Sequence, residues 1–125
     1  VSELGLEGRV TIGDAVPRAE IASLFATHDA LVNNMRAGAP DKVVYEAAAA
    51  CLPVLASNPI FDELLDPEHR FTRWDPGALA DRIRALGALT IEERAILGHR
   101  LRERVAAGHS VQSWARGILE AAGLL

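Results

Sequence analysis

The chain has 125 residues, of which 50% are hydrophobic and 24% are charged, and its formal net charge is -4. This length and composition are typical of one globular domain with a modest core and exclude a largely disordered chain. The acidic balance, without any cluster of Lys and Arg, argues against nucleic acid or an anionic membrane surface as the main partner.

The first half of the chain is predicted to alternate strands and helices. A strand at residues 10–12 is followed by a helix over residues 17–27, with a proline at its first position. Short, apolar runs at residues 30–33 and 54–57 are typical of buried parallel strands, and a helix over residues 41–50 lies between them.

The second half is predicted to be mainly helical. Residues 59–65 form a short helix or turn, and residues 70–74 are a candidate fourth strand. Helices then run to about residues 86, 107 and 122. They begin at the N-cap residues Asp75, Thr90 (in a capping box with Glu93) and Ser110. The whole pattern predicts an α/β fold, with a Rossmann-like parallel sheet flanked by helices.

Cysteine content and hydropathy indicate in which cellular compartment the protein is expected. The single Cys51 excludes an internal disulfide, and no Cys/His spacing fits a structural zinc site. No apolar stretch approaches the roughly 20 residues of a membrane span, and no basic-then-apolar leader opens the chain. We therefore expect a cytoplasmic protein without a membrane span. Because Val1 is not an initiator residue, we also expect a cut or processed N-terminus.

The segment from residue 35 to residue 57 is the most informative part of the chain, because a loop, a helix and a strand follow one another there. The helix must begin at the carboxyl end of the preceding strand, which is where ligands bind in open α/β sheets. Unpaired N–H groups and the positive end of the helix dipole favour phosphate at such a place. Lys42 and Glu46 are four residues apart and share one face of this helix.

Four stretches, in the same order along the chain, resemble one enzyme family. Residues 46–57, with the sequence EAAAACLPVLAS, are similar to its E-A-M-A-x-G-x-P-V-V-A-S signature, and residues 8–21, 28–32 and 75–80 are similar to three further stretches. The family is that of GT-B-fold glycosyltransferases, in the retaining group with an E-x7-E motif that uses nucleotide-sugar donors. The resemblance implies an N-terminally incomplete, C-terminal donor-binding domain, whose last helices at residues 90–125 pack on it or across to a missing N-terminal domain.

The same resemblance implies a UDP- or GDP-type sugar donor, an unknown acceptor, hexosyl transfer and no bound metal or other cofactor. Glu46 occupies the second acidic position of the motif and would accept hydrogen bonds from the donor ribose. Gly38 stands at the first acidic position, where the family has Glu. Gly38, Ala39 and Lys42 would then contact the diphosphate, and Ser57 would lie near the nucleotide. No catalytic residue is assigned, and the chain alone is expected to be inactive.

Several of these residues are also compatible with a purely structural role. Glu46 could be a solvated helix residue, or could form a weak ion pair with Lys42. Turn capping accounts for Ser57 and Asn58 about as well as ligand binding does. Cys51 is expected to be a packing residue.

At the level of function, two alternatives to a transferase stay open. One is an inactive GT-B-like binding or scaffolding module, which Gly38 favours because it replaces an acidic residue. The other is a sugar-nucleotide epimerase, whose catalytic acids would have to come from another domain. The scattered histidines and the lack of G-x-G-x-x-G argue against a hydrolase triad and a dinucleotide site.

The resemblance also predicts how the sheet is completed. The family's strand order, 3-2-1-4-5-6, would place residues 10–12 at strand 3 and residues 30–33 at strand 4, with strands 1 and 2 absent between them. The bare edge of residues 30–33 is then expected to pair with residues 10–12 or to dimerise, or the chain is the remainder of a longer polypeptide.

Overall fold

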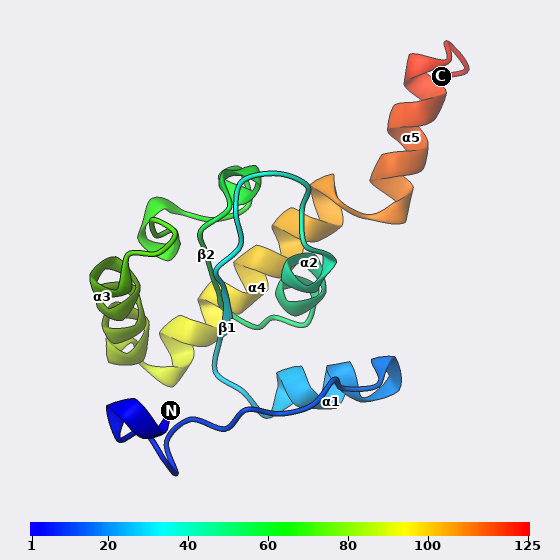
Figure 1. The fold of residues 1–125 in the computed structure, drawn as a ribbon. Helices are drawn as coiled ribbons and strands as arrows, with labels where there is room; N and C mark the ends of the chain where they lie inside the picture. The colour runs from blue at the N-terminus through cyan, green and yellow to red at the C-terminus, as the bar shows by residue number, and fades with distance from the viewer.

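The computed structural model describes residues 1–125 and confirms an α/β fold, shown in Figure 1. The α-helices are α1 (Ile21–Ala26), α2 (Lys42–Ala49), α3 (Pro76–Ala88), α4 (Ile91–Gly108) and α5 (Val111–Ala121). The strands are β1 (Leu31–Asn33) and β2 (Val54–Ala56). Four 3-10 turns lie at Ser2–Leu4, Arg18–Glu20, Pro59–Phe61 and Pro67–His69.

The sheet is small and parallel. Strands β1 and β2 pair in the register Leu31 to Val54, Val32 to Leu55 and Asn33 to Ala56. A further parallel bridge joins Ala56 to Arg70, on the other side of β2 from β1. Helices α2 and α3 lie on opposite sides of the strands (Figure 1). This arrangement is compatible with part of a Rossmann-like parallel sheet flanked by helices.

The hydrophobic core lies between β2, α2 and α4. All three residues of β2 are buried, as is one face of each of the two helices. The buried helix residues are Val44, Ala47 and Ala48 of α2 and Leu97, Gly98, Leu101 and Val105 of α4. Small residues at this contact let the two helix backbones approach closely, and α2 and α4 form the main helix pair of the fold.

Helix α2 ends in a Schellman motif, which satisfies its last carbonyl groups. The N–H of Cys51 donates to the carbonyl of Ala48, and the N–H of Leu52 donates to that of Ala47, both at 3.0 Å. Cys51 has a φ of 61°, in the left-handed region that glycine adopts most easily. Cys51 thus occupies a backbone position that suits glycine, the residue found here in the signature that residues 46–57 resemble. The side chain of Cys51 is partly buried, and its Sγ lies 3.8 Å from Nδ1 of His99.

The predicted N-caps of the last three helices are confirmed. The Asp75 carboxylate accepts from the N–H of Ala78 at 2.9 Å, and Ser110 Oγ accepts from the N–H of Ser113 at 3.1 Å. Thr90 and Glu93 form the reciprocal capping box. Because caps depend on residues two or three positions apart, the sequence alone was sufficient to place them.

Three of the predicted elements need correction. Residues 10–12 form no strand, because no neighbouring strand pairs with them and their backbone lies exposed. The candidate strand at residues 70–74 is reduced to the bridge at Arg70, since the chain turns at once, with the N–H of Asp75 donating to the carbonyl of Thr72. The predicted helix over residues 17–27 opens as a 3-10 turn and becomes α-helical only from Ile21.

The free edge of β1 is therefore not covered by residues 10–12, so that predicted pairing is wrong. Dimerisation through this edge stays a prediction. At the other end of the chain, α5 projects away from the remaining helices (Figure 1), and none of its residues is buried. No helix of the structure combines the length and the apolar character needed to cross a membrane.

An ion-pair network joins the turn Pro67–His69 to α4. The Asp66 carboxylate lies 2.8 Å from the guanidinium of Arg104 and 3.5 Å from that of Arg100. The hydrogen bond from Arg104 holds the pKa of Asp66 below its usual value. Arg104 also donates to the carbonyl of Leu64, so its side chain bonds both Leu64 and Asp66 to α4.

The buried His69 predicts a pH-dependent stability. Burial lowers the pKa of His69 below its ordinary value of 6.5. Between the lowered pKa and 6.5 the unfolded chain therefore binds more protons than the folded chain, and stability must fall as the pH decreases through this window. We expect the thermal midpoint to fall as the pH decreases below about 6.5, and to fall less steeply in His69→Asn. His28→Asn, at an exposed histidine, is the control; equal slopes in the two variants would exclude His69 as the cause.

Candidate functional site

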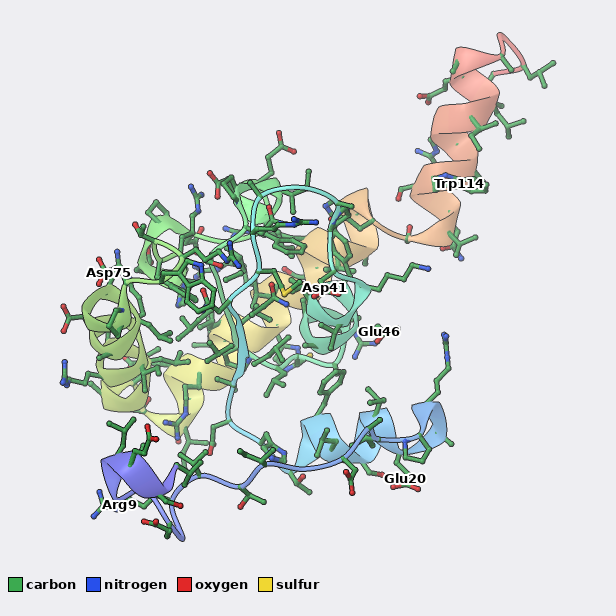
Figure 2. All side chains as sticks on the ribbon, viewed as in Figure 1. Arg9, Glu20, Asp41, Glu46, Asp75 and Trp114 are labelled. Carbon is green, nitrogen blue, oxygen red and sulfur yellow. The ribbon has the colours of Figure 1, made fainter.

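The loop at residues 34–41 connects the carboxyl end of β1 to the start of α2 and arches over the ends of both strands (Figure 1). It encloses an open hollow of about 550 Å³ that is lined by residues 35–41. The predicted residues Gly38 and Ala39 lie in the wall of this hollow. Figure 2 shows Asp41 at the end of the loop, beside the first turn of α2.

Polar side chains at the ends of both strands hold the loop in place. Asn33, the last residue of β1, donates from Nδ2 to the Asp41 carboxylate at 3.1 Å. Ser57, directly after β2, donates from Oγ to the carbonyl of Met35 at 2.8 Å. The two bonds fix both ends of the loop to the carboxyl edge of the sheet.

Asn58 holds the middle of the loop. This buried residue, 3% exposed, donates from Nδ2 to the carbonyls of Gly38 and Ala39, both at 3.4 Å. Its Oδ1 accepts from the N–H of Ile60, so it also caps the turn that follows β2. The shape of the hollow thus depends on a side chain from the turn that follows β2.

Gly38 is in a conformation that other residues rarely adopt, with a φ of 146°. A Cβ built at this position meets no atom within 4 Å. The backbone conformation, and not lack of space, therefore favours glycine at the position where the family motif has its first Glu.

The N-terminus of α2 has free hydrogen-bond donors. The N-cap residue Asp41 makes no side-chain cap, because its carboxylate is bonded to Asn33. The backbone N–H groups of Lys42 and Val43 have no acceptor in the structure. In α3, α4 and α5 a side chain caps the N–H of the third helix residue, and the N–H groups before it have no acceptor either. What distinguishes α2 is that its free N–H groups lie next to the hollow. Two N–H groups and the positive end of the α2 dipole are therefore available next to the hollow, an arrangement suited to an anion.

Comparison with known proteins identifies the family. Residues 3–120 match a family model described as glycosyl transferase-like. The chain belongs to this glycosyl transferase-like family. Searches of curated proteins and of solved structures gave no match. The family membership confirms the resemblance to glycosyltransferases on which the sequence interpretation was based, and it supports a glycosyltransferase module.

Two predicted residues of this glycosyl transferase-like domain lie on the exposed side of α2. Lys42 is its first residue, and Glu46 lies one turn further along the same face. Both side chains are exposed, and no ion pair or hydrogen bond joins them to each other or to another side chain. Figure 2 shows Glu46 directed away from the body of the domain. The ion pair that was the alternative role for these two residues is thus not formed.

The structure brings together only part of the predicted set. Gly38 and Ala39 line the hollow, and Lys42 follows it directly, whereas Glu46 lies a turn away. The hydroxyl of Ser57 is engaged with the loop carbonyl of Met35, as the turn-capping alternative supposed.

Asn33 is a site residue that the sequence analysis missed. It is 6% exposed, and its Oδ1 is buried without a hydrogen-bond partner. A polar residue at the end of an otherwise apolar strand is unusual, because burying an amide costs free energy unless it is bonded. The polar residue was visible in the sequence. Its hydrogen bond to Asp41 was not, because the two residues are eight positions apart.

One other group of residues has ligand atoms close together. Single ligand atoms of Asp66, Glu68 and His69 lie within 4.8 Å of one another. The guanidinium groups of Arg100 and Arg104 already neutralise the Asp66 carboxylate. Two cations beside one carboxylate disfavour a third, so we assign this group no metal-binding role.

Proposed function

We propose that this chain is the donor-binding part of a retaining GT-B glycosyltransferase and that it binds the nucleoside diphosphate of a UDP- or GDP-type hexose. The main support is the uncapped N-terminus of α2, where the N–H groups of Lys42 and Val43 have no partner beside a hollow lined by Gly38 and Ala39. Family membership supports the glycosyltransferase class.

In this proposal the diphosphate lies against the start of α2. The free N–H groups and the Lys42 ammonium offset the negative charge that develops on the leaving diphosphate, and electrostatic stabilisation of this kind usually contributes most to the rate enhancement. Gly38, without a side chain, lets the loop backbone approach a phosphate closely. Stabilisation of the leaving group then comes from the protein alone, without a bound metal.

Glu46 is proposed to bind the ribose. Its carboxylate offers about four acceptor sites, enough for two adjacent hydroxyl groups. Its position one turn along α2 from Lys42 supports this role, since the ribose of a nucleotide lies next to its diphosphate. The absence of an ion pair leaves it available for this role.

The remaining catalytic groups would come from an N-terminal domain, as the resemblance to GT-B enzymes implies. We therefore expect no turnover by these 125 residues alone. The second candidate function is a binding module without transfer activity. This second candidate is favoured by Gly38, which stands where the motif has its first acidic residue and whose φ of 146° suits glycine better than glutamate.

Calorimetry with UDP, GDP, UMP and GMP tests the proposal. One of the two diphosphates is expected to bind at least about tenfold more tightly than its monophosphate, because the second phosphate reaches the helix N-terminus. In NMR spectra the amide signals of Lys42 and Val43 should shift on binding. The amide of Ala78, which is capped by Asp75, is the control and should not move. Failure of both diphosphates to bind would overturn the proposal.

A further inference from the structure

A second hollow, separate from the one lined by residues 35–41, lies at the same edge of the sheet. It has a volume of about 280 Å³ and lies between the residue after β1 and the start of α3. Its lining residues are Asn34, Phe71, Trp74, Asp75, Pro76 and Leu79. Figure 2 shows Asp41 between Asp75 and Glu46, so this hollow lies on the side of the loop opposite to the proposed ribose contact.

Trp74 is held in an unfavourable conformation at this hollow. Its φ is 64°, in the left-handed region, where a bulky aromatic residue is an outlier. Such strain persists only when the surroundings impose it, and it is concentrated at ligand sites. The ring is nevertheless not packed in the core, because Trp74 is 73% exposed. Trp74 is the third residue of the turn in which the N–H of Asp75 donates to the carbonyl of Thr72, so this turn imposes the positive φ and leaves the ring free.

Polar groups surround the ring of Trp74 at this hollow. The guanidinium carbon of Arg73 lies 4.6 Å from the ring centroid, a cation–π contact that covers one face. Asp75 uses Oδ1 to cap α3, and Oδ2 has no hydrogen-bond partner. The side-chain amide of the exposed Asn34 has no partner either. The hollow thus combines an aromatic face with a free carboxylate oxygen and a free amide.

We propose that Trp74, Asn34 and Asp75 form a subsite for a pyranose ring. A pyranose has an apolar face of C–H groups, which packs on the negative face of an indole, and hydroxyl groups at its rim, which suit a carboxylate and an amide. The choice of a sugar over a nucleobase rests on the proposed function. Figure 2 shows Asp41, at the start of α2, between Glu46 and Asp75. A nucleotide with its ribose at Glu46 and its diphosphate at the start of α2 therefore directs its sugar end, or an acceptor sugar beyond it, towards Asp75 and this hollow.

Tryptophan fluorescence tests this subsite directly. The chain has two tryptophans, so Trp114→Ala leaves Trp74 as the only one. In that variant we expect a saturable change in emission with at least one methyl glycoside of glucose, mannose, galactose or N-acetylglucosamine, or with a UDP- or GDP-sugar. Binding of a methyl glycoside that persists in saturating UDP or GDP would identify an acceptor ring. Binding of the nucleotide sugar, with no response to the free glycoside, would identify the donor ring.

Two substitutions separate a ligand role from a structural one. Trp74→Gly removes the ring but suits a φ of 64°, so we expect an unchanged or higher thermal midpoint together with at least a tenfold loss of sugar affinity in calorimetry. Trp114→Ala, at the other exposed tryptophan, should keep the affinity. No saturable response to any sugar, or a response only to uridine or guanosine, would overturn the proposal. If UDP or GDP binds but no sugar does, the subsite is wrong and the proposed function stands. If a sugar binds but neither UDP nor GDP does, the proposed function is wrong and the subsite stands.

Discussion

Gly98→Ala is expected to lower the free energy of unfolding by about 3 kcal/mol, towards the upper end of the cost of overpacking a core. A Cβ built on Gly98 of α4 overlaps the carbonyl oxygen of Cys51 and stands 2.8 Å from its carbonyl carbon. The clashing atoms belong to the backbone at the end of α2, so no side chain can rotate away. The two helices must move apart, which loosens the α2–α4 contact at the centre of the core.

Gly117→Ala provides the matched control, because it makes the same change in the interior of another helix. A Cβ at Gly117 of α5 meets no atom within 4 Å. Alanine favours a helix over glycine, so we expect a neutral or stabilising effect of up to about 1 kcal/mol. Urea denaturation of both variants measures the difference. If Gly98→Ala and Gly117→Ala had the same free energy of unfolding, α2 and α4 would not lie as close together as the structure has them.

The sequence predicted the helices better than the strands, for a physical reason. Helix α4 was predicted within a residue at its C-terminus, because its capping box and apolar periodicity are local features. The strand at residues 10–12 was predicted from its apolar residues and from the resemblance to the family's strand 3, and no partner strand pairs with it. A strand is stable only in a sheet, so composition could not decide whether it forms.

The candidate site shows the same limit. The phosphate-binding potential of α2 was predicted from the order of loop and helix, and the structure adds the free N–H groups of Lys42 and Val43. The bonds that shape the loop join residues that are far apart in the chain, as Ser57 and Met35 are. No local pattern marks such pairs. The left-handed conformation of Trp74 was equally hidden, since tryptophan carries no signal for it.

Lys42→Ala and Glu46→Ala are each expected to weaken binding of the preferred nucleoside diphosphate by about 1–3 kcal/mol, the scale of a lost charge-assisted hydrogen bond. The two losses should differ in kind. Lys42→Ala should reduce the preference for a diphosphate over a monophosphate, because Lys42 is placed at the phosphates. Glu46→Ala should weaken the diphosphate, the monophosphate and the nucleoside alike, because all three carry the ribose. Calorimetry with the three ligands separates the effects.

Arg116→Ala and Glu120→Ala are matched controls for these two variants. Arg116 and Glu120 are also a basic and an acidic residue four positions apart on an exposed helix face, and they form no ion pair with each other. They lie on α5, which projects away from the loop (Figure 1). Their loss should leave nucleotide affinity unchanged, and added salt should weaken binding by the wild-type protein more than binding by Lys42→Ala, since an exposed charge is screened. If Lys42→Ala and Glu46→Ala bind the diphosphate as tightly as these controls do, the nucleotide does not bind at the start of α2.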